Sequence, residues 1–194
     1  MKLQCFASIH ARNCADFAQT RQNSGSTRAW DTPRVDVPPT ASQQTEDDER
    51  WMRLAIEEAQ IAEAHGDVPI GAVVVAGGKV VGRGRNEREL ASDPTAHAEV
   101  LALREAARTI GDGWRVTGGT LYVTLEPCTM CAGAIVLSRV PRVVFGAFDP
   151  KAGAAGSVLS VLDRPEFNHR PDVATGVLHD ECAELLRAFF RARR

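Results

Sequence analysis

The chain has 194 residues, 44% of them hydrophobic and 25% charged, which is typical of one globular domain with room for a tail. Its formal net charge of −2 excludes a global basic field that would recruit nucleic acid, so any RNA contact must come from local patches. No apolar run approaches the roughly 18 residues needed to cross a bilayer, so we expect no membrane partner.

Residues 1–45 differ from the rest of the chain. They are rich in Ser, Thr, Gln, Asn and Pro and have little periodicity, so we expect a disordered N-terminal extension before a folded domain at 46–194. Two alternatives stay open. One is a transit peptide, which the scattered arginines favour and which Asp16, Asp31 and Asp36 disfavour, because transit peptides contain few acids. The other is that the true start codon lies further downstream.

The first predicted elements are a helix and a hairpin. Acidic residues 46–49 precede apolar positions at helical spacing, which predicts an amphipathic helix over about 48–64 with the acids at its start. Two β-branched segments follow, at 70–75 and 79–85. The Ala76-Gly77-Gly78 sequence between them is typical of a hairpin turn.

Helices and strands then alternate to the C-terminus. Asp93-Pro94 is expected to open a helix that runs to about Arg108. The next expected elements are a strand at 120–125, a helix from Pro127 to about Ser138, strands at 142–147 and 173–178, and a last helix capped by Asp180. This order predicts an α/β fold, a three-layer α/β/α sandwich around a mixed five-stranded sheet.

Two short motifs carry the chemistry: His97-Ala98-Glu99, and Pro127-Cys128-Thr129-Met130-Cys131 further along the chain. His97, Cys128 and Cys131 are suited to hold one Zn²⁺ per subunit and to leave its fourth position for water. The two cysteines open a predicted helix, whose N-terminal partial charge favours the thiolate form that binds metal. Glu99 remains as the catalytic group that would move protons between that water and a substrate.

A structural zinc site is the alternative for the same residues. Structural sites are usually closed by four Cys or His ligands, and the fourth would have to be His179 or Cys182. A Cys128–Cys131 disulfide is less favoured, because five irregularly spaced cysteines do not resemble a disulfide framework. Thiol ligands suit a reducing compartment, so we expect a cytoplasmic protein.

From about Glu49 to Arg194 the chain resembles the bacterial tRNA-specific adenosine deaminases, within the larger cytidine and deoxycytidylate deaminase-like zinc family. The zinc motifs are shared with the larger family. The segments specific to the subfamily are residues 93–99, 121–128, 151–157, 168–170 and 189–194.

The resemblance implies a cytidine deaminase-like fold and a zinc-dependent hydrolysis of adenosine to inosine. The target would be wobble position 34 of a tRNA anticodon, chiefly tRNA-Arg(ACG), splayed from the anticodon stem-loop into a pocket. It also implies a homodimer whose partner chain helps to shape each RNA site.

The resemblance further assigns substrate-binding roles. Asn86 would contact the target nucleoside, the N–H of Ala98 would hold the attacking water or the adenine edge, and Asp149 would lie near the target ribose. Arg191, Arg193 and Arg194 would bind the RNA backbone. A turn-forming Asn, a loop Asp before Pro150 and solvated arginines are the alternatives.

Two rival functions remain at this point. One is a deaminase of small substrates such as cytidine, deoxycytidylate or guanine, with the same zinc chemistry. The other is a non-catalytic zinc-containing RNA-binding subunit, which the presence of Glu99 disfavours.

Overall fold

The computed structural model describes residues 41–193, with side chains from residue 46 onward. The expected N-terminal extension therefore lies outside the described residues, apart from 41–45, which begin the first helix. Arg194 also lies outside them. No helix within the described part is long and apolar enough to cross a membrane.

A mixed five-stranded sheet forms the centre of the domain, in the order β2-β1-β3-β4-β5. Its strands are β1 (Gly71–Ala76), β2 (Lys79–Arg85), β3 (Gly119–Leu125), β4 (Arg142–Ala147) and β5 (Asp172–Thr175). Strand β1 pairs antiparallel with β2 and β3, whereas β3, β4 and β5 are parallel. The parallel strands point their carboxyl ends to the same edge, and the candidate site lies at that edge.

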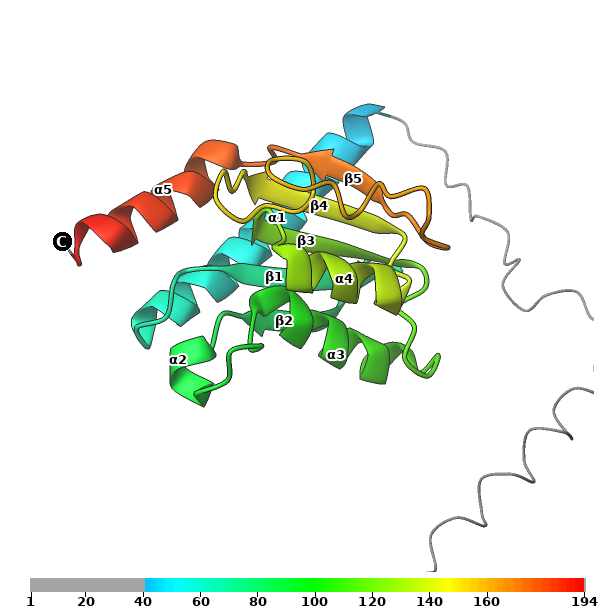
Figure 1. Ribbon diagram of the computed structural model, residues 1–194, viewed down its shortest axis with the longest axis horizontal. Coiled ribbons are helices and arrows are strands. Elements are labelled where there is room, and N and C mark those ends of the chain that lie inside the picture. The colour runs from blue at the N-terminus through cyan, green and yellow to red at the C-terminus, as the bar shows by residue number, and fades with distance from the viewer. Residues whose placement is uncertain (1–40, 194) are drawn as a thin grey trace, which may run out of the picture. The chain divides into compact units, whose positions relative to one another are not determined.

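Helices cover both faces of the sheet and complete the three layers (Figure 1). They are α1 (Ala41–Ala64), α2 (Arg88–Ala91), α3 (Ala98–Ile110), α4 (Thr129–Ser138) and α5 (His179–Arg191). One core lies between the sheet and α3 and α4, and the other between the sheet and α1 and α5. The predicted three-layer sandwich is confirmed.

Two glycines of β2 let α3 lie directly on the sheet. A Cβ atom at Gly82 would be 2.3 Å from the carbonyl oxygen of Ala102, and one at Gly84 would be 2.1 Å from that of Ala98. Both separations are below van der Waals contact, so only glycine fits beneath the helix. The close approach of β2 sets the position of the first residue of α3, which follows His97.

The hairpin between β1 and β2 forms at the predicted residues. Gly77 and Gly78 have φ of 56° and 71°, the pair of left-handed conformations that a tight type I′ turn requires. A β-bulge between Val74 and Val75 shifts the register of the two strands.

Several predicted boundaries were wrong for local reasons. The helix expected at Asp93-Pro94 begins at Ala98, because the Asp93 carboxylate accepts hydrogen bonds from the N–H and hydroxyl of Thr95 and forms a turn instead. The helix expected at Pro127 begins at Thr129, with Cys128 at its N-cap position. Asp180 does not cap the last helix, whose N-cap is Leu178 with a left-handed φ of 51°.

The first helix and the last strand also differ from the prediction. Helix α1 begins at Ala41, so the acids at 46–49 do not stand at its start. One of them, Asp48, is instead buried against the sheet. Strand β5 ends at Thr175, because Gly176 with φ of 79° turns the chain toward α5. The four-residue helix α2 was not predicted.

Candidate metal centre and active site

The structure brings three candidate ligands together at the starts of two helices. His97 is the N-cap of α3, Cys128 is the N-cap of α4, and Cys131 lies in the first turn of α4. Nδ1 of His97 is 3.7 Å from Sγ of Cys128 and 3.5 Å from Sγ of Cys131. All three ligand atoms lie within 4.8 Å of one another. The group is compatible with a bound metal ion.

These separations fit a tetrahedral cation with one nitrogen and two sulfur ligands. Bonds of about 2.1 Å to nitrogen and about 2.3 Å to sulfur imply an N to S separation of about 3.6 Å. The two observed distances of 3.7 and 3.5 Å bracket that value. Nδ1 is the ring nitrogen that faces both sulfur atoms, so it is the candidate donor atom.

The electrostatics of the two thiols favour metal binding. The pKa of Cys128 falls to about 3, chiefly because of the hydrogen bonds of its sulfur with Cys131 and then with His97. The pKa of Cys131 is raised, because its thiol donates to Cys128 and is buried. This arrangement favours the thiolate form of Cys128, and a cation would release the proton of the Cys131 thiol.

Glu99 lies in the first turn of α3 and is 4% exposed. Burial raises the pKa of its carboxyl above the ordinary value, and its backbone hydrogen bond and the neighbouring His97 and Cys131 only partly oppose this. A carboxyl with a raised pKa beside a metal site is suited to both accepting and returning a proton.

The two alternatives for the cysteines find no support. Among residues 41–193 the cluster contains only His97, Cys128 and Cys131. Cys182 lies in the core on the α1 and α5 side of the sheet, where burial raises the pKa of its thiol to about 12. Cys128 and Cys131 are free thiols and not a disulfide. The described residues therefore offer three candidate ligands at this centre and no fourth Cys or His.

Asn86, which follows β2, is 3% exposed. Its backbone N–H donates to the carbonyl of Ile70 at 2.9 Å, and its side-chain Nδ2 donates to the carbonyl of Val68 at 3.2 Å. The next residue, Glu87, donates its N–H to the carbonyl of Ala96 at 3.0 Å, next to His97. Asn86 is thus buried and fixed, unlike an exposed turn residue.

Ala98 and Asp149 approach the same region from other elements. Ala98 is buried and is the first residue of α3, where an N–H has no acceptor within its own helix. Asp149 is half-buried in the loop after β4. Its Oδ1 accepts the N–H groups of Lys151 at 2.9 Å and Ala152 at 3.2 Å, so one carboxylate oxygen shapes the loop.

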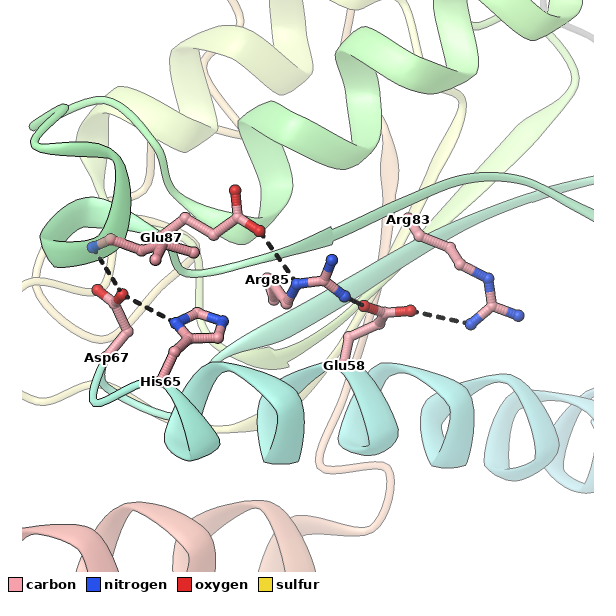
Figure 2. A network of polar contacts seen from close by, with 7 residues as sticks. Glu58, His65, Asp67, Arg83, Arg85 and Glu87 are labelled. Atoms are coloured by element: carbon pink, nitrogen blue, oxygen red, sulfur yellow. Dashed lines mark hydrogen bonds and ion pairs between the residues drawn. The ribbon is translucent and has the colours of Figure 1, made fainter.

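A network of ion pairs supports the Asn86 side of the site (Figure 2). Glu58 of α1 accepts Nη1 of Arg83 at 3.0 Å and Nη1 of Arg85 at 2.7 Å. Nε of Arg85 also donates to Glu87 at 3.0 Å. The network connects α1 with Arg85 and Glu87, the residues on either side of Asn86 at the end of β2.

Asp67 fixes the start of α2 in the same view (Figure 2). It is 1% exposed, and its two carboxylate oxygens accept the N–H groups of Glu89 at 2.9 Å and Leu90 at 3.1 Å. His65 lies 3.3 Å from the same carboxylate. A distant aspartate thus takes the place of a local N-cap.

Comparisons with known proteins agree with this geometry. A family model described as MafB19-like deaminase matches residues 46–194. A tRNA-specific adenosine deaminase of Bacillus subtilis (strain 168) is 54% identical over 147 residues, which cover 76% of this chain and 91% of that relative. This chain belongs to the tRNA-specific adenosine deaminase family.

Solved structures of related proteins support the assignment of this deaminase. One, from a study of tRNA:A34 deaminases acting at the wobble position, has a TM-score of 0.68 and 45% identity and covers 71% of this chain and 99% of its own. A guanine deaminase from Nitrosomonas europaea has a TM-score of 0.60 and 26% identity, covering 82% and 96%. The predicted cytidine deaminase-like fold is confirmed.

Two of the expected RNA-binding arginines of the deaminase, Arg191 and Arg193, lie at the C-terminal end of α5 and just past it, and the third, Arg194, is outside the described residues. Helix α5 runs outward to the C-terminus (Figure 1). Arg191 pairs with Glu184 on the same helix. The guanidinium of Arg193 stacks 3.5 Å above the ring of Phe189. Phe189 is buried, whereas Phe190 is 50% exposed, so the aromatic side chains of α5 are only partly buried.

Phe148 and Pro150 flank Asp149 in the loop after β4. The ring of Phe148 packs edge-on against buried Phe145 at 5.2 Å and lies 5.9 Å from the ring of His179. An aromatic side chain here attaches the start of the loop to β4 and to the beginning of α5.

Sequence reasoning missed two acids that support the site. Asp67 holds α2, and Glu126 accepts hydrogen bonds from the loop that carries Asp149. Both partners lie more than 20 residues away, at separations of 22 for Glu89 and 23 for Asp149. For Glu126 the signal was an acid between Leu125 and Pro127 at the end of a predicted strand, which is costly to bury without donors. Asp67, between Gly66 and Val68, carries no comparable local signal.

Proposed function

We propose that this protein hydrolyses adenosine to inosine at wobble position 34 of a tRNA anticodon, chiefly in tRNA-Arg(ACG). The observation that carries the proposal is the cluster of His97, Cys128 and Cys131 beside buried Glu99, in a chain 54% identical to a tRNA-specific adenosine deaminase. Release of ammonia from C6 of adenine and entry of water give inosine.

The proposal includes one Zn²⁺ held by Nδ1 of His97 and by the two sulfur atoms. The donor set and the N to S distances support zinc over Mg²⁺ or Ca²⁺, which prefer oxygen ligands. When bound, zinc would acidify a water molecule for attack on C6 of adenine.

Glu99 is the proposed proton carrier of the reaction. Its carboxylate would take a proton from the attacking water, deliver it to the ring nitrogen beside C6, and later pass a proton to the departing ammonia. Its burial supports this role, because the raised pKa lets the carboxyl hold a proton between the two transfers.

Substrate contacts are proposed for residues around the cluster. Asn86 would bind the nucleoside, the N–H of Ala98 would hold the water or the adenine edge, and Asp149 would approach the ribose, where a 2′-hydroxyl contact helps to select RNA. Arg191, Arg193 and Arg194 would bind the RNA backbone beyond the splayed base. We also propose that the protein works in the cytoplasm, where thiol ligands stay reduced.

A homodimer is proposed from the outer face of α4. Met130 is 37% exposed and Leu137 is 70% exposed, and their spacing places both on one side of the helix. Helix α4 begins at the metal cluster, so a partner chain that covers this face would stand next to the substrate site. Light scattering of the purified protein measures the mass that tests this point.

The proposed function is tested by incubating the protein with an anticodon stem-loop of tRNA-Arg(ACG) and sequencing for inosine. Inosine at position 34 is expected, with no deamination of free adenosine, cytidine, deoxycytidylate or guanine. Deamination of the free compounds alone would favour the small-substrate alternative. Bound zinc with no turnover on any of them would favour a non-catalytic RNA-binding subunit.

A further inference from the structure

Four hydrogen-bond donors converge on the carboxylate of Glu126, which follows β3 and is 2% exposed. Oε1 accepts the N–H groups of Ala155 and Ser157, each at 3.0 Å. Oε2 accepts the N–H of Asp149 at 3.0 Å and the hydroxyl of Ser157. All four donors belong to the loop over residues 149–157.

Only an ionised carboxylate satisfies this set of donors. Three of the four are backbone N–H groups, which cannot reverse and act as acceptors. A glutamine would turn an NH₂ group toward at least one of the N–H groups and leave it without an acceptor.

The same loop is attached to the chain beside the metal cluster. The N–H of Ala154 donates to the carbonyl of Pro127 at 2.8 Å, and Cys128 forms an isolated antiparallel bridge with Gly153. A Cβ atom at Gly153 would be 2.4 Å from the carboxyl carbon of Glu126, so the loop backbone lies directly on the carboxylate. Glu126 therefore connects a candidate metal ligand with Asp149.

We propose that Glu126 is a positioning residue, which fixes the 149–157 loop and thereby sets Asp149 at a defined place beside the reacting adenosine. The proposal rests on the proposed function for the identity of the substrate. Glu126 acts through Asp149 and makes no contact with the adenosine itself. Its removal should therefore weaken substrate binding more than it impairs the metal centre.

The test compares wild type, Glu126→Gln and a matched control, Glu105→Gln, below the unfolding temperature of each. Glu105 also accepts one backbone N–H, that of Arg83 at 2.9 Å, but on the exposed side of α3. In Glu126→Gln, KM for the anticodon stem-loop should rise on the order of 10- to 100-fold, with a smaller change in kcat and unchanged bound zinc. Glu105→Gln should leave all three quantities at the wild-type values.

Amide hydrogen exchange gives a readout that does not depend on turnover. In Glu126→Gln the N–H of Asp149 should exchange at least about tenfold faster, while amides of β3 and β4 keep their protection. Ser157→Ala, which removes one donor and keeps the carboxylate, should shift KM in the same direction by less. It serves as the second variant if Glu126→Gln does not fold.

The proposal would be overturned if Glu126→Gln had the same KM as the wild type and the N–H of Asp149 exchanged at the same rate. Loss of zinc with an unchanged KM would also overturn it, because the residue would then serve the metal centre and not the loop. If the wild-type protein forms no inosine, the proposed function fails, and the exchange rates still decide whether Glu126 fixes the loop.

Discussion

The guanidinium of Arg142 forms two parallel hydrogen bonds of 2.7 Å with the carboxylate of Asp48, so the start of β4 is joined to α1. The hydroxyl of Tyr122 donates to the same carboxylate at 3.0 Å. Asp48 is 5% exposed, and its partners come from the two central parallel strands. These hydrogen bonds join α1 to strands β3 and β4 of the sheet.

Asp48→Ala should therefore destabilise the protein by about 2–3 kcal/mol, because it leaves the partly buried guanidinium of Arg142 and the hydroxyl of Tyr122 without their partner. Urea denaturation followed by tryptophan fluorescence measures the change. The control is Glu49→Ala, since Glu49 forms only an exposed pair with Arg53 on the same helix and should cost less than about 0.5 kcal/mol. Equal effects of the two variants would contradict the stabilising role of the buried pair.

Tyr122, the only tyrosine of the chain, should ionise at unusually high pH. Burial and the Asp48 carboxylate raise the pKa of its hydroxyl above the ordinary value of about 10. Because the folded state favours the neutral form, this contribution to stability is complete below about pH 10 and is lost as pH rises toward the folded-state pKa. Tyrosinate absorbance should thus appear only as the protein unfolds, and a titration near pH 10 in folded protein would refute this.

Glu99→Gln should retain zinc and lose at least about 100-fold in turnover, because the amide cannot accept a proton from water. Metal analysis and inosine formation on the stem-loop are measured on the same preparation. Glu89→Gln, on the exposed surface of α2, is the control. Substantial deamination by Glu99→Gln would assign proton transfer to another group.

Gly84→Ala should reduce zinc binding although residue 84 is no ligand. The added methyl group would overlap the carbonyl of Ala98 and push the start of α3, with His97, away from Cys128. We expect destabilisation of about 1–3 kcal/mol together with weaker retention of zinc against a chelator. Gly133→Ala is the control in α4, where nothing lies within 4 Å of a new Cβ atom and stability should be unchanged or slightly higher.

Arg193→Ala combined with Arg194→Ala should weaken binding of the stem-loop. The slope of log K against log salt should fall by about one for each phosphate that the variant no longer neutralises. Arg53→Ala, on α1, is the control for a general reduction of positive charge. Identical affinity of the double variant across the salt range would remove these arginines from the RNA site.

The strand and helix pattern could be predicted because most of it is local. Strand β4 was predicted at its observed limits, and Gly77-Gly78 fixed the hairpin because the turn requires left-handed residues. The metal cluster followed from the spacing of two motifs. Helix α2 was missed because the acid that caps it, Asp67, is 22 residues away from Glu89.

The role of Glu126 was also beyond a local pattern. Its donors lie 23 to 31 residues later, and only the parallel pairing of β3 with β4 brings them to the end of β3. The start of α5 was misplaced for a related reason. Leu178 takes a left-handed conformation that its own residue type does not favour, and the surrounding chain imposes it.

The position of the three candidate ligands on two separate helices has a consequence for how the polypeptide matures. His97 follows the hairpin, and the two cysteines follow the neighbouring central strand. A cation can therefore join them only after the strands have paired, unlike a zinc finger, whose metal drives the folding of a short segment. We therefore expect the metal to bind late, after the sheet has formed. A newly made chain without zinc should still reach the same backbone topology.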